Sequence, residues 1–374
     1  MEFRFTDEQD TMGRIAREFA DNEIVPFAGI WDKNREFPVK TLKRMHSSGL
    51  LTIGIPEEYG GAGLDHVSQS LVTEEIARGD AGIAAVMAVS TLIGSKPVLV
   101  AGTHEQKKWW YGMELEGCLT ALCMPGPDAH SGQSVMEVNC RRRGDEYILN
   151  GSHQSVYNGA GAGLYAVFAS LDNSAGPRGT CAFMVDRNTA GIGVEPLFQA
   201  GMRNSDNAAV IYDDVRVSVH NLLGKEGDGV NIADLTQTIA RVTTAAMAVG
   251  VAQATFETVA PYSLQRYQFG KPIYELPEVY LLLADMAHLI EQGRLAHLIA
   301  ANMLDGNFAD DETLYQTRYL CTEIATKAAR DALQIYGGPG LGVEFPVEKY
   351  YRDARILKYW MEQPWLKKIL SPAI

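Results

Sequence analysis

The sequence has few cysteines, and their arrangement excludes several classes of protein. Only five of the 374 residues are cysteine, and no two of them form a CxxC pair or a spacing typical of a metal site. The N-terminus is charged from residue 2, so it does not resemble a secretory signal. The odd cysteine count then predicts free thiols in a reducing compartment, and we expect a cytoplasmic protein. The cysteines are Cys118, Cys123, Cys140, Cys181 and Cys321.

Positive charge and long apolar runs are also scarce. The chain has 33 lysines and arginines against 46 aspartates and glutamates, which gives a net charge of −13. The basic residues are scattered rather than clustered, so we predict no nucleic-acid partner. The short run Arg141–Arg143 is followed by Gly-Asp-Glu and is typical of a hairpin turn. No apolar run approaches the ~20 residues of a membrane-spanning helix, so we predict no membrane contact.

What the sequence does contain is enough apolar residues for more than one packed unit, since they make up 46% of the chain. Residues 1–117 have the pattern of a helical domain. Thr6 followed by Gln9 fits a capping box at a helix start, and apolar residues from Met12 to Phe19 then recur at helical spacing. A glycine-rich loop, GIPEEYGGAGLD, interrupts these helices.

The pattern changes twice more along the chain. Residues 118–225 contain short β-rich runs such as LYAVFAS and TCAFMVD, separated by glycine-rich turns, which indicates a β domain. Residues 226–374 are rich in Ala, Leu and Met at helical spacing, and one long helical run ends at a pair of glycines. We therefore predict an α+β multi-domain fold with an N-terminal helical domain, a central β domain and a C-terminal four-helix bundle.

Several strings stand in a fixed order along nearly the whole chain. FTDEQ and EEIARGDAG lie in the first segment, YILNGSHQSVYNG and DDVRVSVHNLLGKEGDGV in the second, and RYQFGKPI and QIYGGPGLGVEFPVEKYYRDARI in the third. Together they resemble the acyl-CoA dehydrogenase family of flavoproteins.

The resemblance implies FAD-dependent α,β-dehydrogenation of an acyl-CoA thioester. In that family a glutamate removes the α-proton, the thioester oxygen is stabilised by hydrogen bonds, and flavin N5 accepts the β-hydride. Electrons then pass to an electron-transfer flavoprotein. Members are usually tetramers in which each FAD lies across a subunit interface. The isoalloxazine ring lies in one subunit, and the C-terminal bundle of its neighbour holds the ADP half.

The position of the family's catalytic base holds no acid in this chain. That glutamate lies nine residues after the Arg that matches Arg352, and counting from there reaches Met361. Glu362, the next residue, could act as a base only if the backbone slips by one residue, because one helical step turns a side chain by ~100°. Other members carry the base just before the Arg matching Arg241, where this chain has Ala240. Arg241 itself is a candidate substrate contact.

The positions that the resemblance places at the flavin ring are altered too. The family's Trp-Ile-Thr-Asn string reads Ser-Val-Tyr-Asn here, so Ser155 replaces a stacking Trp and Tyr157 replaces a small hydroxyl residue. The family's Thr-Glu-Pro string has become Cys123, Met124 and Pro, and Ser131 remains as a candidate substrate contact in the loop that follows.

The positions that would hold a neighbour's ADP half match the family better. Arg266 stands where the family places a guanidinium on the pyrophosphate, and Phe269 follows it in register. Gln334 precedes Gly337 and Gly338, whose lack of a side chain permits close approach of a ligand. Each residue also has a simpler interpretation, as a solvated arginine or a helix-capping glycine.

This asymmetry favours one of three hypotheses. The first is a degenerate subunit of a heterotetramer, which completes the FAD site of a homologous catalytic acyl-CoA dehydrogenase subunit. That complex would act on an acyl-CoA with an electron-transfer flavoprotein as acceptor. The second is an active homotetramer that uses Glu362 or another base. The third is a flavin-dependent monooxygenase relative, which needs no base but still needs a flavin pocket.

Overall fold

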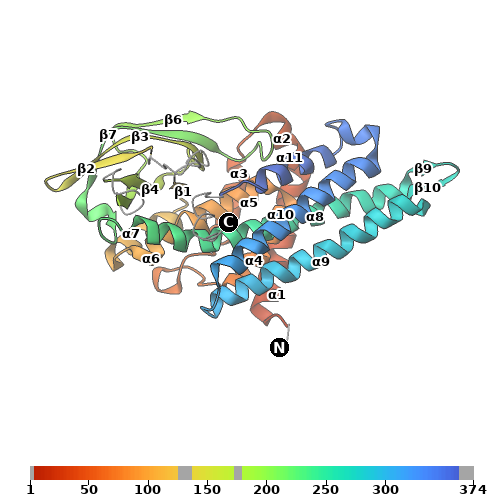
Figure 1. The fold of residues 1–374 in the computed structure, drawn as a ribbon, viewed down its shortest axis with the longest axis horizontal. Helices are drawn as coiled ribbons and strands as arrows, with labels where there is room; N and C mark the ends of the chain where they lie inside the picture. Colours follow the sequence, from red (N-terminus) through yellow and green to blue (C-terminus); the bar gives the residue numbers. More distant parts are fainter. Residues whose placement is uncertain (1–3, 125–136, 172–178, 362–374) are drawn as a thin grey trace, which may run out of the picture.

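The computed structural model describes residues 4–124, 137–171 and 179–361 (Figure 1). A twisted β sheet lies at one end of the molecule, and long helices extend from it to the other end. The predicted fold class is confirmed, with helices up to Leu115, strands between Thr120 and Leu223, and helices again from Gly229.

The first segment is helical. Its α-helices are α1 (Asp7–Phe19), α2 (Val25–Asn34), α3 (Val39–Ser47), α4 (His66–Gly79), α5 (Ala81–Ala88), α6 (Lys96–Ala101) and α7 (His104–Leu115). Two short π-helices, η1 (Ala20–Ile24) and η3 (Val89–Ile93), follow α1 and α5, and a 3-10 helix, η2 (Glu57–Tyr59), lies before α4. Thr6 and Gln9 form the predicted capping box at α1. The string EEIARGDAG, whose composition is typical of a single helix, is divided between α4 and α5, because Asp80 is extended and its side chain caps α5 at the Ile83 amide.

Within the described residues the sheet follows the strand order β6-β7-β3-β2-β4-β5-β8, and β1 is added parallel to β4. The strands are β1 (Thr120–Cys123), β2 (Asn139–Arg143), β3 (Glu146–Tyr157), β4 (Leu164–Ser170), β5 (Thr180–Asp186), β6 (Ile192–Pro196), β7 (Asn207–Ser218) and β8 (Leu222–Leu223), with a short helix η6 (Val219–Asn221) before β8. The predicted hairpin turn after Arg143 joins β2 to β3. Alternate side chains build two cores: Tyr147 and Phe183 lie within the β domain, whereas Phe168 and Met184 pack on the helices.

The last segment forms the predicted four-helix bundle. Its elements are α8 (Gly229–Gln265), the hairpin β9 (Tyr267–Gln268) and β10 (Lys271–Pro272), η7 (Ile273–Glu275), α9 (Pro277–Asp305), α10 (Asp311–Tyr336), η8 (Gly338–Leu341) and α11 (Val347–Leu357). Helix α4 packs along α8 in the same core. A Cβ at Gly250 of α8 would lie only 2.2 Å from the Glu74 carbonyl oxygen of α4, so only glycine allows this approach.

Two helical stretches of the described chain are long and apolar enough to span a bilayer by length and composition. They are Ala81–Ala101 and Gly229–Gln265. The first has 21 residues, whereas the sequence analysis expected no apolar run close to the ~20 residues of a membrane-spanning helix. Their most apolar windows are 83% and 89% buried inside the protein, which is the property of core helices.

Candidate functional site

The predicted base position lies just after the end of α11. Arg352 is within α11, the helix ends at Leu357, and a turn carries the chain to Met361, which is partly buried. Met361 has a φ of 54°, a left-handed conformation that is uncommon for a residue with a side chain. A thioether there cannot accept a proton. Glu362 lies outside the described residues.

The turn before Met361 is held by an arginine that the sequence did not single out. Arg318, on α10, is 5% exposed, and its Nη2 donates to the carbonyl oxygens of Lys358 at 3.0 Å and Trp360 at 3.1 Å. These bonds satisfy carbonyls that the end of a helix leaves unpaired. The sequence signal for this role is a charged residue on the inward side of an amphipathic helix. An arginine that pairs with a carboxylate produces the same pattern, so the signal does not distinguish the two roles.

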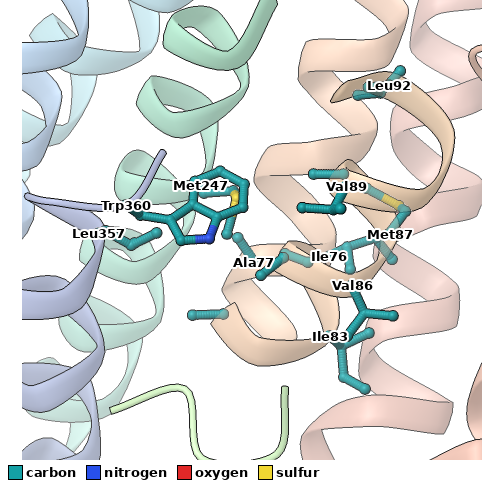
Figure 2. Packing of buried hydrophobic residues seen from close by; sticks show 14 of the residues in the cluster. Ile76, Ala77, Ile83, Val86, Met87, Val89, Leu92, Met247, Leu357 and Trp360 are labelled. Carbon is teal, nitrogen blue, oxygen red and sulfur yellow. The ribbon is translucent and has the colours of Figure 1, made fainter. Parts of the chain in front are cut away.

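Trp360 lies inside the helical core beside the predicted base position. It is 2% exposed and packs near Leu357 and Met247 (Figure 2). Among the described residues, no acceptor receives the hydrogen bond of its indole N–H. Its ring meets the ring of Tyr157 edge-to-face, with centroids 5.8 Å apart and planes at 80°.

The altered string Ser-Val-Tyr-Asn ends strand β3 at the junction with the helices. Ser155 Oγ donates to Asn207 Oδ1 at 3.2 Å, so this small side chain bonds within the sheet. The Tyr157 hydroxyl donates to Gln199 Oε1 at 2.8 Å, and the phenol is 9% exposed. Burial raises the pKa of Tyr157, and the hydrogen bond to Gln199 opposes that shift. The phenol therefore stays neutral and fixed in place.

The other predicted flavin and substrate contacts have different surroundings. Cys123 is fully buried in the core of the β domain beside the Tyr212 hydroxyl, and burial raises the pKa of its thiol to about 12. Met124 packs in the helical core. Arg241 is buried in α8 and forms an ion pair with Asp311 of α10. Ser131 lies outside the described residues.

Two of the residues predicted to hold the ADP half lie at the end of α8. Arg266 is the exposed residue that follows the helix, and its backbone N–H donates to the Tyr262 carbonyl oxygen. Among the described residues, its side chain has no hydrogen-bond or ion-pair partner. Phe269, in the turn between β9 and β10, is 88% exposed and has a φ of 52°.

The other three residues of this set lie at the end of α10. Gln334 is exposed in the last turn, and Gly337 ends the helix with φ 64° and ψ −141°, a conformation open only to glycine. A Cβ at Gly338 would meet nothing within 4 Å. The stacked rings of Tyr262 and Tyr336, 3.9 Å apart, bring the ends of α8 and α10 together, so the two groups share one end of the bundle.

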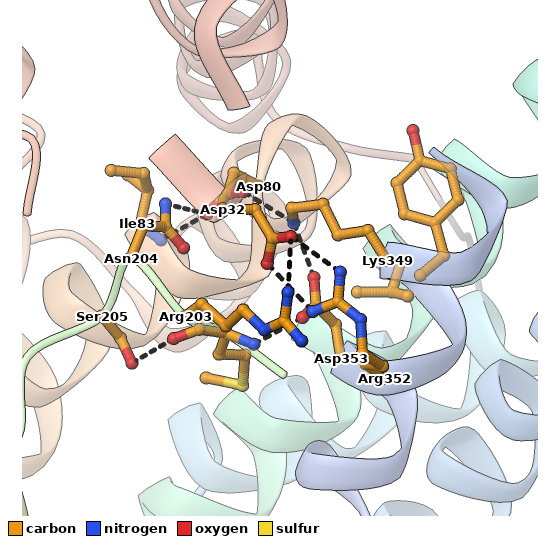
Figure 3. Close-up of polar contacts among 12 residues, drawn as sticks. Asp32, Asp80, Ile83, Arg203, Asn204, Ser205, Lys349, Arg352 and Asp353 are labelled. Carbon is orange, nitrogen blue, oxygen red and sulfur yellow. Dashed lines mark hydrogen bonds and ion pairs between the residues drawn. The ribbon is translucent and has the colours of Figure 1, made fainter. Parts of the chain in front are cut away.

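A buried ion network positions α11 between the domains (Figure 3). Lys349 binds Asp80 at 2.8 Å and Asp353 at 2.6 Å, and Asp353 also accepts a hydrogen bond from the Met202 amide. Burial lowers the pKa of Lys349, but the two carboxylates outweigh it and raise the pKa above its ordinary value. Next to them, Arg352 binds Asp32 of α2 through two hydrogen bonds of 3.0 and 2.7 Å.

Comparisons with known proteins agree along the whole chain. Three family models match in order: acyl-CoA dehydrogenase, N-terminal domain at residues 6–117, middle domain at 121–215 and C-terminal domain at 227–361. An acyl-CoA dehydrogenase of Bacillus subtilis (strain 168) is 36% identical over 359 residues, which cover 95% of this chain and 94% of that protein. The chain belongs to the acyl-CoA dehydrogenase family.

Solved structures support the same assignment. Butyryl-CoA dehydrogenase from Megasphaera elsdenii superposes with a TM-score of 0.94 at 29% identity, covering 100% of this chain and 99% of that one. A chain from a study of the electron transferring flavoprotein of Acidaminococcus fermentans superposes with a TM-score of 0.95 at 32% identity. The match covers 100% of this chain and 98% of that one. The family performs FAD-dependent dehydrogenation of acyl-CoA, and the assignment of Met361 to the position of the base stays a prediction from the spacing after Arg352.

The two halves of FAD fit this family member unequally. The exposed end of the bundle suits the ADP half, because Gly338 leaves open space and Arg266 has no partner among the described residues. The inner position does not suit the isoalloxazine ring, because the buried phenol of Tyr157 is bonded to Gln199 and packed against Trp360. This chain's own residues therefore supply no chemical step at that position.

Proposed function

We propose that this chain is the non-catalytic subunit of a heterotetrameric acyl-CoA dehydrogenase. In this proposal it completes the FAD site of a homologous catalytic subunit, so that four chains hold two FAD molecules. The observation that carries the proposal is the contrast within one chain. At the position that the resemblance gives to the flavin ring, Tyr157 is bonded to Gln199 and packed against Trp360. At the bundle end, Gly338 leaves open space and the Arg266 side chain has no partner within the described part of the chain.

The chemistry at Met361 supports a non-catalytic role. Dehydrogenation begins when a base takes the α-proton of the thioester, and a thioether has no basic atom to receive it. The family's other base location holds Ala240 here, which is apolar and buried. Arg241, the polar residue that follows, is engaged by Asp311. A chain in a homotetramer would lose activity with these changes, but a chain beside a catalytic partner would not.

The bundle end supports the cofactor-completing role. Bound FAD supplies the hydride acceptor of the family's reaction, and this chain would hold its ADP half. Arg266 would pair with the pyrophosphate through charge-assisted hydrogen bonds, and Gly337 and Gly338 would let backbone and ligand approach closely. Phe269, 88% exposed at the hairpin tip, offers an apolar ring surface to the same partner.

The remaining partners follow from the family. The complex would dehydrogenate an acyl-CoA and pass electrons to an electron-transfer flavoprotein. The structural likeness to a chain from a study of such a flavoprotein supports this choice of acceptor. A cytoplasmic location, predicted from the odd number of cysteines, belongs to the same proposal.

The test is the flavin content of the chain expressed alone and with its partner. We expect the isolated chain to be colourless, and the co-purified complex to contain two FAD molecules per four chains. Absorbance of the released flavin and the protein concentration give this ratio. A yellow homotetramer with one FAD per chain and dehydrogenase activity would overturn the proposal and favour an active enzyme with Glu362 or another base.

A further inference from the structure

Tyr157 is anchored to the β domain but points into the helical core. It is the last residue of β3, and its neighbour Val156 packs inside the β domain whereas Tyr157 packs with the helices. Its hydroxyl donates to Gln199 Oε1 at 2.8 Å. The amide nitrogen of Gln199 in turn donates to the Met202 carbonyl oxygen at 3.2 Å and to Ser205 Oγ at 2.9 Å. The phenol is therefore held in one orientation.

Trp360 completes the contact from the opposite side. Its ring stands edge-to-face on Tyr157 with centroids 5.8 Å apart, a geometry that stabilises the pair beyond the burial of the two rings. Arg318 fixes the Trp360 backbone through its carbonyl oxygen. Figure 2 shows the indole between α11 and the helices of the first segment, next to Leu357 and Met247. We call Tyr157 and Trp360 together the aromatic plug.

We infer that Tyr157 is the residue that closes this subunit to its own flavin ring, and that the aromatic plug excludes the ring by occupying its place. The inference rests on the proposed function in one respect, since both take this chain to carry no flavin of its own. It adds the cause, which is steric exclusion by one side chain rather than the loss of favourable contacts.

The two causes differ in what they cost. Loss of a stacking partner at Ser155 or of polar contacts weakens binding but leaves the space open. Tyr157 must instead leave a buried site before a ring can enter. Its departure breaks the hydrogen bond to Gln199 and exposes a buried aromatic ring to water, so the binding of a flavin ring must first offset both losses. A single substitution at Tyr157 should therefore have an effect that substitutions at Ser155 lack.

The experiment compares four variants of the full chain expressed alone. Tyr157→Thr removes the ring and keeps a hydroxyl, and Tyr157→Val removes both and suits the end of a strand. Tyr157→Phe keeps the ring as a matched control, and Ser155→Trp adds a stacking surface without opening space. Each folded variant, checked by circular dichroism, is titrated with FAD and with lumiflavin, which is the bare ring and needs no ADP site.

We expect Tyr157→Thr and Tyr157→Val to bind lumiflavin at least about tenfold more tightly than wild type, a difference of ~1.4 kcal/mol. Tyr157→Phe and Ser155→Trp should bind no more tightly than wild type. Binding should quench the fluorescence of Trp360, because an inserted ring lies against the indole. This quenching is measured as the difference between each variant and the same variant with Trp360→Phe, since the chain has four other tryptophans. This quenching locates the flavin, which an unspecific change in stability would not do.

The outcomes separate the plug from the proposed function. If wild type already binds one FAD per chain, the proposed function fails. If wild type binds no FAD, and the Thr and Val variants fold yet bind lumiflavin no more tightly than Tyr157→Phe, the inference of steric exclusion is wrong and the proposed function stands. Because Val at this position keeps the core apolar, the test survives if Tyr157→Thr does not fold. Binding without quenching of Trp360 would also overturn the inference.

Discussion

Arg266 offers the sharpest test of the proposed shared cofactor site, because its side chain has no hydrogen-bond or ion-pair partner in residues 4–124, 137–171 and 179–361. It follows the end of α8 as an exposed residue, where its backbone N–H donates to the Tyr262 carbonyl oxygen and its own carbonyl oxygen accepts from the Ile273 N–H. Replacing such a surface side chain by alanine changes the free energy of unfolding by no more than about 0.5 kcal/mol. Any large effect of Arg266→Ala must therefore arise from a bound partner.

The expected effect on FAD affinity follows from the chemistry of the contact. A hydrogen bond between a guanidinium and a phosphate contributes ~1.5–3 kcal/mol. At about 1.4 kcal/mol per decade, Arg266→Ala should raise the FAD dissociation constant of the complex roughly 10–100-fold. Arg266→Lys should recover only part of this loss, because an ammonium cannot reproduce the two-pronged geometry of the guanidinium.

The assay is a fluorescence titration of the apo-complex with FAD, in which only this chain carries a substitution. Excess FAD should restore turnover, since the catalytic chain is untouched. Arg143→Ala is the matched control, an exposed arginine at the β2–β3 turn far from the bundle end. If Arg266→Ala and Arg143→Ala give the same dissociation constant as wild type, Arg266 is a surface residue and the argument from the bundle end fails.

Two further predictions concern carboxylates. Glu362→Gln should change turnover of the complex by no more than a few-fold, whereas loss of a true base costs at least ~10²-fold, and a loss of that size would favour the active homotetramer. Glu114→Gln should stabilise the chain by about 3 kcal/mol at pH 7. Burial raises the pKa of Glu114 to about 8 from 4.5, although hydrogen bonds from Ser95 and Trp110 oppose the shift. At pH 7 the unfolded chain carries an ionised Glu114 that folding must protonate, and the neutral amide of Gln removes this cost. The stability due to its neutral form is complete below pH 4.5 and is lost as the pH rises to 8. The free energy of unfolding, measured with urea, should therefore fall more steeply with pH in wild type than in Glu114→Gln, and equal slopes would contradict the assignment.

The fold followed from the sequence where one element explains its own pattern. The strings LYAVFAS and TCAFMVD coincide with β4 and β5, because each is a continuous apolar run between turn residues and is buried on both faces. Helices α9 and α10 followed from apolar periodicity and from clear stops, the second at Gly337. The break between α4 and α5 was missed, although Asp80 is a local N-cap signal for α5; its long-range contacts with Lys349 and Asn204 could not be seen in the sequence.

The candidate site divides in the same way. Met361 was assigned to the base position by counting from Arg352, since spacing along one segment is a local property, and this assignment stays a prediction. The contact between Tyr157 and Trp360 could not be predicted, because it joins a strand end to the turn after a helix in a different domain. The role of Arg318 was equally hidden, since its partners are backbone carbonyls, which look the same in every sequence.

The ion network at α11 also decides how much the retained motif says about catalysis. The string EKYYRDAR is among the strongest points of resemblance to the family, and it lies on the helix just before the base position. Its Lys349 and Asp353 are buried with Asp80, and its Arg352 binds Asp32, so these side chains join α11 to the first segment and to the loop after β6 (Figure 3). Removing one partner of such a buried pair costs ~3–5 kcal/mol, because a charge is then left uncompensated. Structure alone therefore explains why this motif is intact, and an intact motif beside Met361 is compatible with a chain that keeps the family's architecture and has given up its base.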